Sequence, residues 1–288
     1  GAQALVNGSG GFQGPVIHPQ HWDPEIDYEG KRIVVIGSGA TAVTLVPELA
    51  KKAAKVTLLQ RSPTYIMNLP SEDAVANFLR KVLPGRVAHQ LSRWKNILFS
   101  VIFYQLSRRR PRLIRRFIEK GVRQELGEDY DMRHFTPRYD PWDQRLCLVP
   151  DADLFEAIRA GKAEVVTDTI DQFIEKGIRL GSGKELEADL IITATGLKVQ
   201  LMGGMTLHVN GKRVNTGRTH CYRGALFSDV PNFAVAVGYT NASWTLKCDL
   251  NSHFVTRLLN YMDEHEYTVC TPRFDPERQV SKPLLDFD

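Results

Sequence analysis

The sequence predicts an α/β protein with a doubly wound, Rossmann-like parallel sheet. Short apolar runs rich in β-branched residues, typical of strands buried on both faces, alternate with segments of helical period. The first two runs, 32–36 and 55–60, flank a glycine-containing turn and a helical segment over 43–54, which is the order of a βαβ unit. With 43% apolar and 24% charged residues among 288, the chain has the balance of an ordinary globular protein.

The turn after the first strand has the pattern of a dinucleotide-binding loop, G-x-G-x-x-A. In such a loop the first glycine permits the tight turn, the second lets the backbone approach a pyrophosphate, and the alanine lets the helix pack closely on the strand. The helix then offers free N–H groups and a partial positive charge to the phosphates. The predicted loop residues are Gly37, Ser38, Gly39, Ala40, Thr41 and Ala42. The alternative is a tight turn that binds no ligand.

The end of the second strand favours NADP over NAD. NAD sites usually place an acidic residue there to bind the ribose 2′-hydroxyl. This sequence instead has Gln60, followed by Arg61 and Ser62. A guanidinium matches a 2′-phosphate in charge and geometry, and a hydroxyl can assist it. We therefore predict that Arg61 and Ser62 select NADP, the alternative being a surface arginine at a strand end.

A strongly basic helical insertion is predicted at about 71–145. Between residues 80 and 123 there are thirteen Lys or Arg and one acidic residue, Glu119. The apolar run 97–104 is too short to span a bilayer, but it can lie flat on an anionic membrane with arginines at the headgroups. The alternative is a set of packed helices with a solvated basic face.

The second half of the chain returns to alternating patterns. The dipeptide Asn210-Gly211 predicts a hairpin. Apolar residues at steps of four predict a helix over 246–265. Strands are predicted at 165–167, 177–180, 189–193 and, as another buried run, 232–237.

Ahead of the βαβ unit lies a second motif, F-x-G-x-x-x-H-x-x-x-W-D. Its fixed positions are Phe12, Gly14, His18, Trp22 and Asp23. At every one of them the sequence resembles the fingerprint of the Baeyer–Villiger monooxygenases. Further segments, among them 60–65, 141–147 and 238–244, resemble the ethionamide-activating branch of that family. The resemblance covers nearly the whole chain from about residue 12 onward.

The resemblance implies an FAD- and NADPH-dependent monooxygenase that uses O2, through a peroxyflavin, to oxidise a ketone, sulfide or thioamide. Arg145 matches the family's active-site arginine. A guanidinium is always charged and carries several N–H donors, so it can stabilise negative charge that develops during a reaction. The alternative for Arg145 is an ion pair with Asp140 or Asp143. Thr195 and Gly196 match the strand end where the family's chain passes back towards the flavin.

The same resemblance divides the chain into three parts. Residues 1–30 are expected to be a linker and the end of a flavin domain. Residues 31–188 are expected to be the NADP-binding domain, and 189–288 a remnant of the FAD-binding domain. Because family members open with a glycine-rich FAD loop that this sequence lacks, we expect a chain truncated at both ends. Alone, it should bind NADPH weakly, hold FAD poorly and be inactive.

Two other functions are considered. A pyridine nucleotide–disulfide reductase shares the architecture but needs a closely spaced redox cysteine pair. The four cysteines, Cys147, Cys221, Cys248 and Cys270, form no such pair and no metal-ligand pattern. The other candidate is a stand-alone NADP-binding module. A net charge of +4 without a basic and aromatic stripe does not predict nucleic-acid binding. We expect a cytoplasmic protein, with residues 80–123 as a candidate peripheral contact at the inner face of the membrane.

Overall fold

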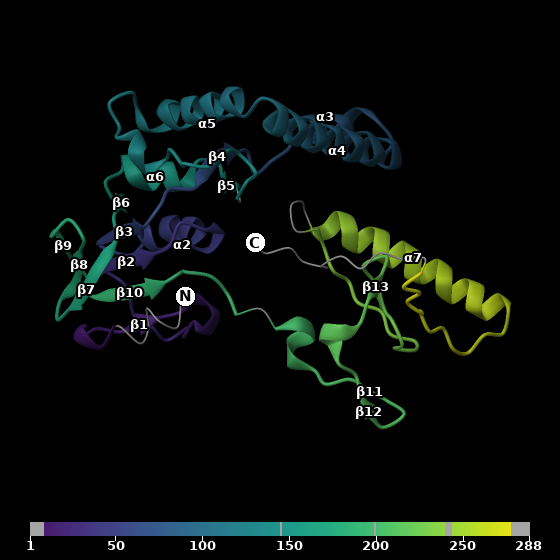
Figure 1. Ribbon diagram of the computed structural model, residues 1–288. Helices are drawn as coiled ribbons and strands as arrows, with labels where there is room; N and C mark the ends of the chain where they lie inside the picture. Colours follow the sequence, from purple (N-terminus) through teal and green to yellow (C-terminus); the bar gives the residue numbers. More distant parts are fainter. Residues whose placement is uncertain (1–8, 145, 199, 240–243, 278–288) are drawn as a thin grey trace. The chain divides into compact units, whose positions relative to one another are not determined.

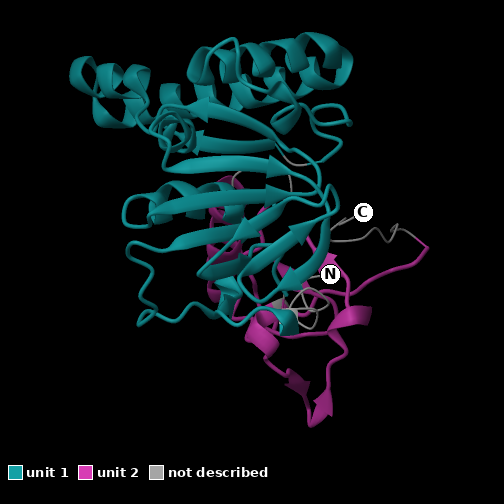
Figure 2. Ribbon diagram, turned by 90° about the vertical axis from the view of Figure 1, so that its left-hand side faces the viewer, with its two compact units in different colours: residues 1–198 teal, residues 199–288 magenta. Residues whose placement is uncertain are grey.

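The computed structural model describes residues 9–144, 146–198, 200–239 and 244–277 (Figure 1). Contacts within the chain divide it into two compact units, which Figure 2 shows in different colours. Unit 1 comprises Gly1–Lys198 and unit 2 comprises Val199–Asp288. Each unit is described by itself.

Unit 1 is built on a five-stranded sheet in which all neighbouring strands are parallel. The strand order is β1 (Val16–Ile17), β10 (Leu190–Thr193), β2 (Arg32–Ile36), β3 (Lys55–Gln60) and β6 (Ala163–Thr167). The strands predicted at 32–36 and 55–60 are confirmed. Because parallel strands need crossover connections, this sheet requires the helices that the sequence places between its strands.

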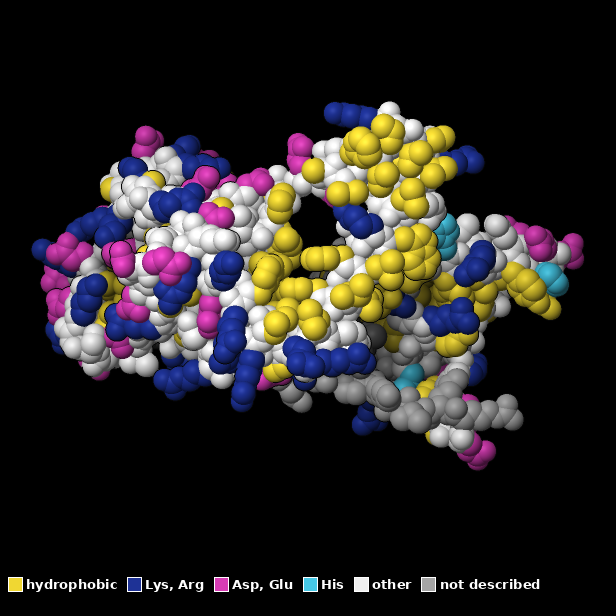
Figure 3. Space-filling view, turned by 90° about the horizontal axis from the view of Figure 1, so that it is seen from above, with side chains coloured by type: hydrophobic (Ala, Val, Ile, Leu, Met, Phe, Trp, Pro, Cys, Tyr) yellow, Lys and Arg dark blue, Asp and Glu magenta, His cyan; other side chains and the backbone are white. Residues whose placement is uncertain are grey.

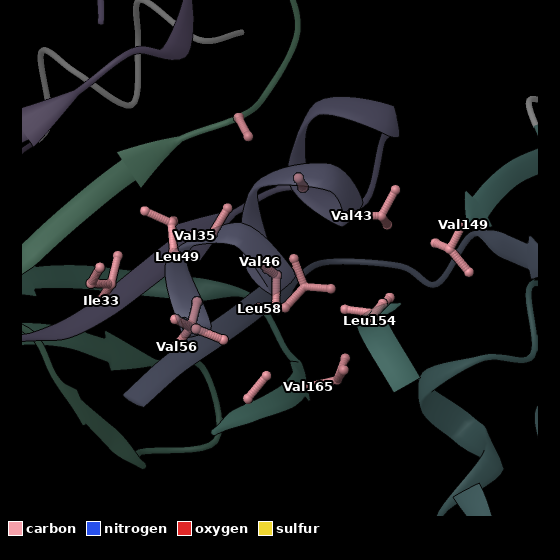
Figure 4. Packing of buried hydrophobic residues seen from close by; sticks show 14 of the residues in the cluster. Ile33, Val35, Val43, Val46, Leu49, Val56, Leu58, Val149, Leu154 and Val165 are labelled. Atoms are coloured by element: carbon pink, nitrogen blue, oxygen red, sulfur yellow. The ribbon is translucent and has the colours of Figure 1, made fainter. Parts of the chain in front are cut away.

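One face of this sheet is covered by α2 (Ala40–Ala50) and α6 (Asp153–Arg159). Side chains alternate along each strand, so Ile33 and Val35 face the helices while Val34 and Ile36 belong to the cluster on the other side. Figure 4 shows the helix-side cluster, in which α2 contributes Val43, Val46 and Leu49 and the strands contribute Ile33, Val35, Val56, Leu58 and Val165. Burial on both faces explains why these strands are continuously apolar.

The opposite face is covered by an antiparallel sheet rather than by helices. Its strands are β7 (Ile170–Ile174), β8 (Gly177–Leu180) and β9 (Glu185–Glu187). Phe173, Ile178 and Leu186 from this sheet pack against Val34 and Ile36. The α/β class is thus confirmed, with helices on one face of the parallel sheet and strands on the other.

The strands β4 (Tyr65–Leu69) and β5 (Leu146–Pro150) form a separate parallel pair. In the sequence, three helices separate these two strands. They are α3 (Ala74–Val82), α4 (Gly85–Arg109) and α5 (Pro111–Leu126), and the 3-10 turn η3 (Met132–His134) follows them. The helices predicted in this basic region are confirmed. The inner face of α5 is buried through Ile114, Ile118 and Val122. The first two of these residues pack with Tyr65 of β4, which anchors the helices to the rest of unit 1.

Unit 2 contains α7 (Trp244–Glu264) and short strand pairs. The predicted hairpin forms between β11 (His208–Val209) and β12 (Lys212–Arg213), and α7 confirms the predicted helix. The other pair is β13 (Cys221–Tyr222) with β14 (Leu226–Phe227), and η4 (Leu201–Gly204) and η5 (Thr216–Arg218) are 3-10 turns.

The prediction of a buried strand at 232–237 is wrong. Asn232 lies in a turn with φ +52°, and the one described ladder contact of the segment is an isolated bridge between Leu226 and Ala234. Asn232, Ala234 and Ala236 are exposed. A β-branched run forms a strand only where a neighbour supplies ladder hydrogen bonds along its length. Here the described backbone bonds from the segment are those of the Asn232 amide to Cys270 and of the Val235 amide to Ala225, which come from two different parts of the chain.

The contact boundary between the units falls at 198/199, after the predicted boundary at 188/189. The reason is that β10 pairs with β2, so residues 190–193 belong to the same sheet as the βαβ unit. Likewise β1, from the segment expected to end a flavin domain, pairs with β10. The cofactors assigned to the three predicted parts stay predictions.

Candidate nucleotide-binding site

The predicted loop lies at the carboxyl edge of the parallel sheet. The segments that follow β2 and β10 meet there, because Ile36 is paired with Thr193 at the ends of these strands. Gly37 adopts φ +141°, and a Cβ on it would lie 2.3 Å from the carbonyl oxygen of Ala194. The chain crosses the sheet in one direction from β1 through β2 and β3 to β6 and then returns to β10, beside β2. Ligands of open α/β sheets bind outside the carboxyl ends of the strands.

The N-terminus of α2 is open to an anion. Gly39 is the N-cap residue, no side chain from the described part of the chain caps the helix, and no acidic residue lies in its first turn. A Cβ on Gly39 would meet nothing within 4 Å, so the space above the loop is free. Ala42, by contrast, is fully buried against the sheet. The uncapped N–H groups and the open approach fit a pyrophosphate.

A second contact fixes the loop from the side. The hydroxyl of Thr64, which follows β3, donates a hydrogen bond to Oγ of Ser38 at 3.0 Å. Thr64 was not among the predicted site residues. The signal that points to it is its place in the 60–65 segment that resembles the monooxygenase family. The loop and the segment bearing the predicted 2′-phosphate ligands are therefore joined directly.

Arg61 and Ser62 are exposed at the end of β3. Gln60, in contrast, is buried, and its side-chain amide donates to the carbonyl oxygen of His134 at 2.7 Å and to Oγ1 of Thr167 at 2.9 Å. Nδ1 of His134 lies 2.8 Å from the same Thr167 hydroxyl, and burial lowers the pKa of this histidine. Both N–H groups of the Gln60 amide are thus occupied, which leaves Arg61 and Ser62 as the donors that face solvent.

The segment after β10 carries an unsatisfied hydroxyl. Oγ1 of Thr195 is buried and has no hydrogen-bond partner within the part of the chain that the structure describes. Buried polar groups nearly always have partners, so this atom is suited to a ligand. Gly196 adopts φ +116°, and its carbonyl oxygen accepts a hydrogen bond from Nε2 of His18 at 2.9 Å. Nδ1 of His18 accepts from the Gln20 amide, so Nε2 carries the proton.

The fingerprint residues tie the start of the chain to the parallel sheet. Phe12 is buried among the side chains of β7–β9, and a Cβ on Gly14 would lie 2.5 Å from the Phe12 ring. Trp22 packs against the helix-side core, and Asp23 accepts a hydrogen bond from the amide of Glu25. None of these side chains except His18 makes a described contact with the 194–196 segment. The motif thus has a structural basis independent of any ligand.

Arg145 lies outside the described residues. Both carboxylates considered as its alternative partners are paired with other arginines: Asp143 with Arg108 at 2.5 Å, and Asp140 with Arg115 at 3.3 Å. Beside them, Trp142 adopts φ +72°, which is unusual for a bulky residue. Its ring packs edge-on against Tyr104 of α4, with centroids 5.6 Å apart.

No group of His, Cys, Asp and Glu side chains among the described residues could hold a metal ion. None of the helices formed by these residues has the length and apolar character needed to cross a bilayer.

A parallel sheet with a glycine-rich turn and a helix N-terminus without a side-chain cap at its carboxyl edge defines an α/β protein with the architecture of the dinucleotide-binding folds. The chain belongs to the flavin-binding monooxygenase-like family, whose model matches residues 5–203. Membership of this family, predicted from the two motifs, is confirmed.

Similar curated proteins carry consistent names. The chain is 53% identical over 283 residues to the FAD-containing monooxygenase EthA of Mycolicibacterium smegmatis, covering 98% of this chain and 58% of that protein. It is 51% identical over 275 residues to the probable FAD-binding monooxygenase AlmA of Acinetobacter baylyi, covering 95% and 55%. The chain thus spans little more than half the length of these relatives.

Solved structures share the fold at low sequence identity. Oxidized steroid monooxygenase bound to NADP matches with a TM-score of 0.66 and 21% identity, over 92% of this chain and 60% of that one. The open structure of cyclohexanone monooxygenase matches with a TM-score of 0.65 and 17% identity, over the same shares.

Proposed function

We propose that this chain is part of an FAD- and NADPH-dependent monooxygenase of the Baeyer–Villiger type. The observation that carries the proposal is the uncapped N-terminus of α2 behind Gly39, with Arg61 exposed at the end of the adjacent strand. Family membership and the names of the relatives support it. A disulfide reductase is less consistent with a sequence that lacks a closely spaced cysteine pair.

NADPH would be held by groups of this chain. The amides of Ala40, Thr41 and Ala42 at the start of α2 would bind the pyrophosphate, since no side chain competes for them. Arg61 and Ser62 would bind the 2′-phosphate through charge-assisted hydrogen bonds.

FAD, when bound, supplies the redox chemistry that places one atom of O2 on a ketone, sulfide or thioamide and releases the other as water, with NADPH as the electron donor. Thr195 is the proposed contact of this chain with a cofactor, because its buried hydroxyl has no described partner. Arg145 is proposed to stabilise developing negative charge. The alternative is an ion pair of Arg145 with Asp140 or Asp143, which also pair with Arg115 and Arg108.

Calorimetric titration with NADPH and NADH tests the nucleotide site. We expect the chain to prefer NADPH and Arg61→Ala to remove that preference, since the 2′-phosphate then loses its cation. We expect Gly39→Ala to weaken both nucleotides, because the new Cβ occupies the pyrophosphate approach without touching protein atoms. Arg213→Ala, which removes an exposed arginine of the unit 2 hairpin, is the matched control.

Equal binding of the two nucleotides, or an unchanged preference in Arg61→Ala, would refute the NADP assignment. A polypeptide of the relatives' full length that contains this chain, binds NADPH selectively and still shows no flavin-dependent oxidation would instead favour the stand-alone NADP-binding module. Thermal unfolding of each variant separates a lost ligand contact from a lost fold.

Residues 80–123 are proposed, in addition, to make a peripheral membrane contact. The support is compositional: thirteen Lys or Arg and one acidic residue accompany an apolar run in this segment.

A further inference from the structure

Large apolar side chains are exposed in stripes along all three helices of the insertion. On α3, Val75, Phe78 and Val82 are between 51% and 62% exposed. On α5, Leu113 and Phe117 are 56% and 59% exposed. On α4 the stripe comprises Val87, Leu91, Trp94, Leu98, Val101 and Ile102, each at least 46% exposed. Spacings of three and four place the members of each stripe on one side of their helix.

These stripes are not left over from loose packing. Each helix has a separate inner side: α3 buries Ala76, α4 buries Ala88 and Ser107, and α5 buries Ile114 and Ile118. The helices also pack against one another, α3 on α4 and α4 on α5. The exposed side chains are therefore surplus to the folding of unit 1. Contiguous apolar surface of this kind usually marks an interaction site.

Cations border the apolar stripes. Exposed basic residues of α3–α5 and of the α4–α5 junction that make no ion pair with other described residues are Arg80, Lys81, Arg86, Arg109, Arg110, Arg112, Arg116 and Lys120. Figure 3, which views the molecule from the side of α3–α5, shows hydrophobic side chains beside Lys and Arg on this face. Such a surface combines apolar insertion with attraction to negative charge.

We propose that the outer sides of α3, α4 and α5 form one docking face for an anionic lipid bilayer. The proposal deepens the peripheral membrane contact proposed above and rests on it. It adds α3 to the contact and assigns the inserted side chains to the three stripes, with the arginines around the α4–α5 junction at the headgroups. The helices then lie in the plane of the interface, as none can cross it.

Charge decides between a bilayer and a protein partner as the occupant. Two copies of this chain meeting through the same face would bring the unpaired cations of both copies together, and like charges at an interface cost several kcal/mol. An anionic bilayer instead supplies a negative surface for all of these cations at once and a hydrocarbon layer for the three stripes.

Vesicle sedimentation tests the docking face. The chain is mixed with vesicles of phosphatidylcholine, with or without phosphatidylglycerol, at low and high salt. We expect binding only with the anionic lipid and weakening at high salt. Leu98→Ser and Phe117→Ser should each weaken binding about tenfold, and Arg112→Gln about fivefold. The matched controls, Leu259→Ser on α7 and Lys176→Gln after β7, should bind like the parent chain.

Trp94 provides an independent readout, because it lies in the middle of the α4 stripe and is 58% exposed. Vesicles of anionic lipid brominated on the acyl chain should quench tryptophan fluorescence of the parent chain. Trp94→Phe, which keeps an apolar ring for docking, should abolish most of that quenching. The remaining tryptophans are Trp22, Trp142 and Trp244, and quenching carried by any of them would place the contact elsewhere.

Three results would overturn the docking face. The first is that the chain does not sediment with anionic vesicles. In the second, the stripe variants bind as tightly as their controls. The third is a dimer, seen by light scattering without lipid, that Leu98→Ser dissociates. NADPH titration of the same samples keeps the proposals apart: docking variants should bind NADPH normally, and loss of lipid binding alone leaves the nucleotide site intact.

Discussion

At the scale of single residues, the Arg32–Asp189 ion pair joins the starts of two neighbouring strands of the parallel sheet. The guanidinium of Arg32, at the start of β2, donates to both carboxylate oxygens of Asp189, and the Arg32 amide donates to the same group at 2.8 Å. This forked ion pair precedes β10 and sets its start beside that of β2. It lowers the pKa of Asp189 to about 2.

A pH-dependent contribution to stability follows. The folded-state pKa of Asp189 lies below its ordinary value of 3.8, so the stabilisation is present above about pH 4 and is lost as pH falls towards 2. Because both side chains are partly exposed, we expect Asp189→Asn to cost about 1 kcal/mol at neutral pH. Urea unfolding at several pH values measures this. A difference between the two proteins that persists undiminished at pH 2 would contradict the assignment.

Single residues also show how far the site follows from sequence. The positions of Gly37 and Ala42 follow from the G-x-G-x-x-A pattern, because a tight turn and close helix packing have the same requirements in every such fold. The role of Gln60 does not follow from the pattern. Its amide is occupied by His134 and Thr167, which lie far away in sequence. Contacts of this kind depend on how the insertion returns to the sheet, which no local pattern encodes.

At the scale of elements, the junction between α3 and α4 depends on one carboxylate. Asp73 caps α3 by accepting from the Ala76 amide at 3.0 Å, and it also accepts from Lys95 of α4 at 2.5 Å. These bonds lower its pKa to about 2. A single side chain thus caps the start of one helix and holds it to the next, in a region where many large apolar side chains are exposed.

Substitutions at this position should separate the two roles. Asp73→Ala removes the cap, worth about 1 kcal/mol, together with the ion pair, and should speed hydrogen exchange throughout α3. Asp73→Asn keeps a capping oxygen and should have a smaller effect. Asp171→Ala, an exposed acid on β7, is the control. Equal exchange rates in Asp73→Ala and the parent chain would show that α3 does not need this residue.

Elements were predictable where the pattern and the packing agree. The run 32–36 is buried on both faces by neighbours from several parts of the chain, and its strand was predicted with the observed bounds. The run 232–237 has the same β-branched character, yet it forms only one bridge. Of the antiparallel sheet β7–β9, the sequence predicts the strand at 177–180 but not β7, because residues 170–174 alternate only weakly between polar and apolar.

At the scale of the whole molecule, burial is concentrated in unit 1. The described core clusters all lie there, whereas α7 of unit 2 has only Asn251 buried among its residues. Sequence periodicity predicted α7 correctly as a helix, but Leu250, at one of the apolar steps, is 50% exposed. The period of apolar residues predicts a helix, but it does not specify which other element packs on the apolar side of that helix.

Hydrogen exchange of the 288-residue chain should reflect this distribution. We expect amides of β2 and β3 to exchange far more slowly than those of α7, because opening the sheet exposes a packed core and opening α7 exposes little. Exchange followed by mass spectrometry resolves these segments. Protection of α7 equal to that of β3 would indicate apolar burial that the described contacts do not contain.

The link between His18 and Gly196 has a mechanical consequence. Gln20 adds two reciprocal hydrogen bonds with the backbone of Lys198, at 3.1 and 3.0 Å. The stretch leaving β1 and the stretch leaving β10 are therefore fastened to each other just beyond the sheet. Displacing either stretch would therefore strain the hydrogen bonds to the other, which fixes the backbone beside the unsatisfied Thr195 hydroxyl.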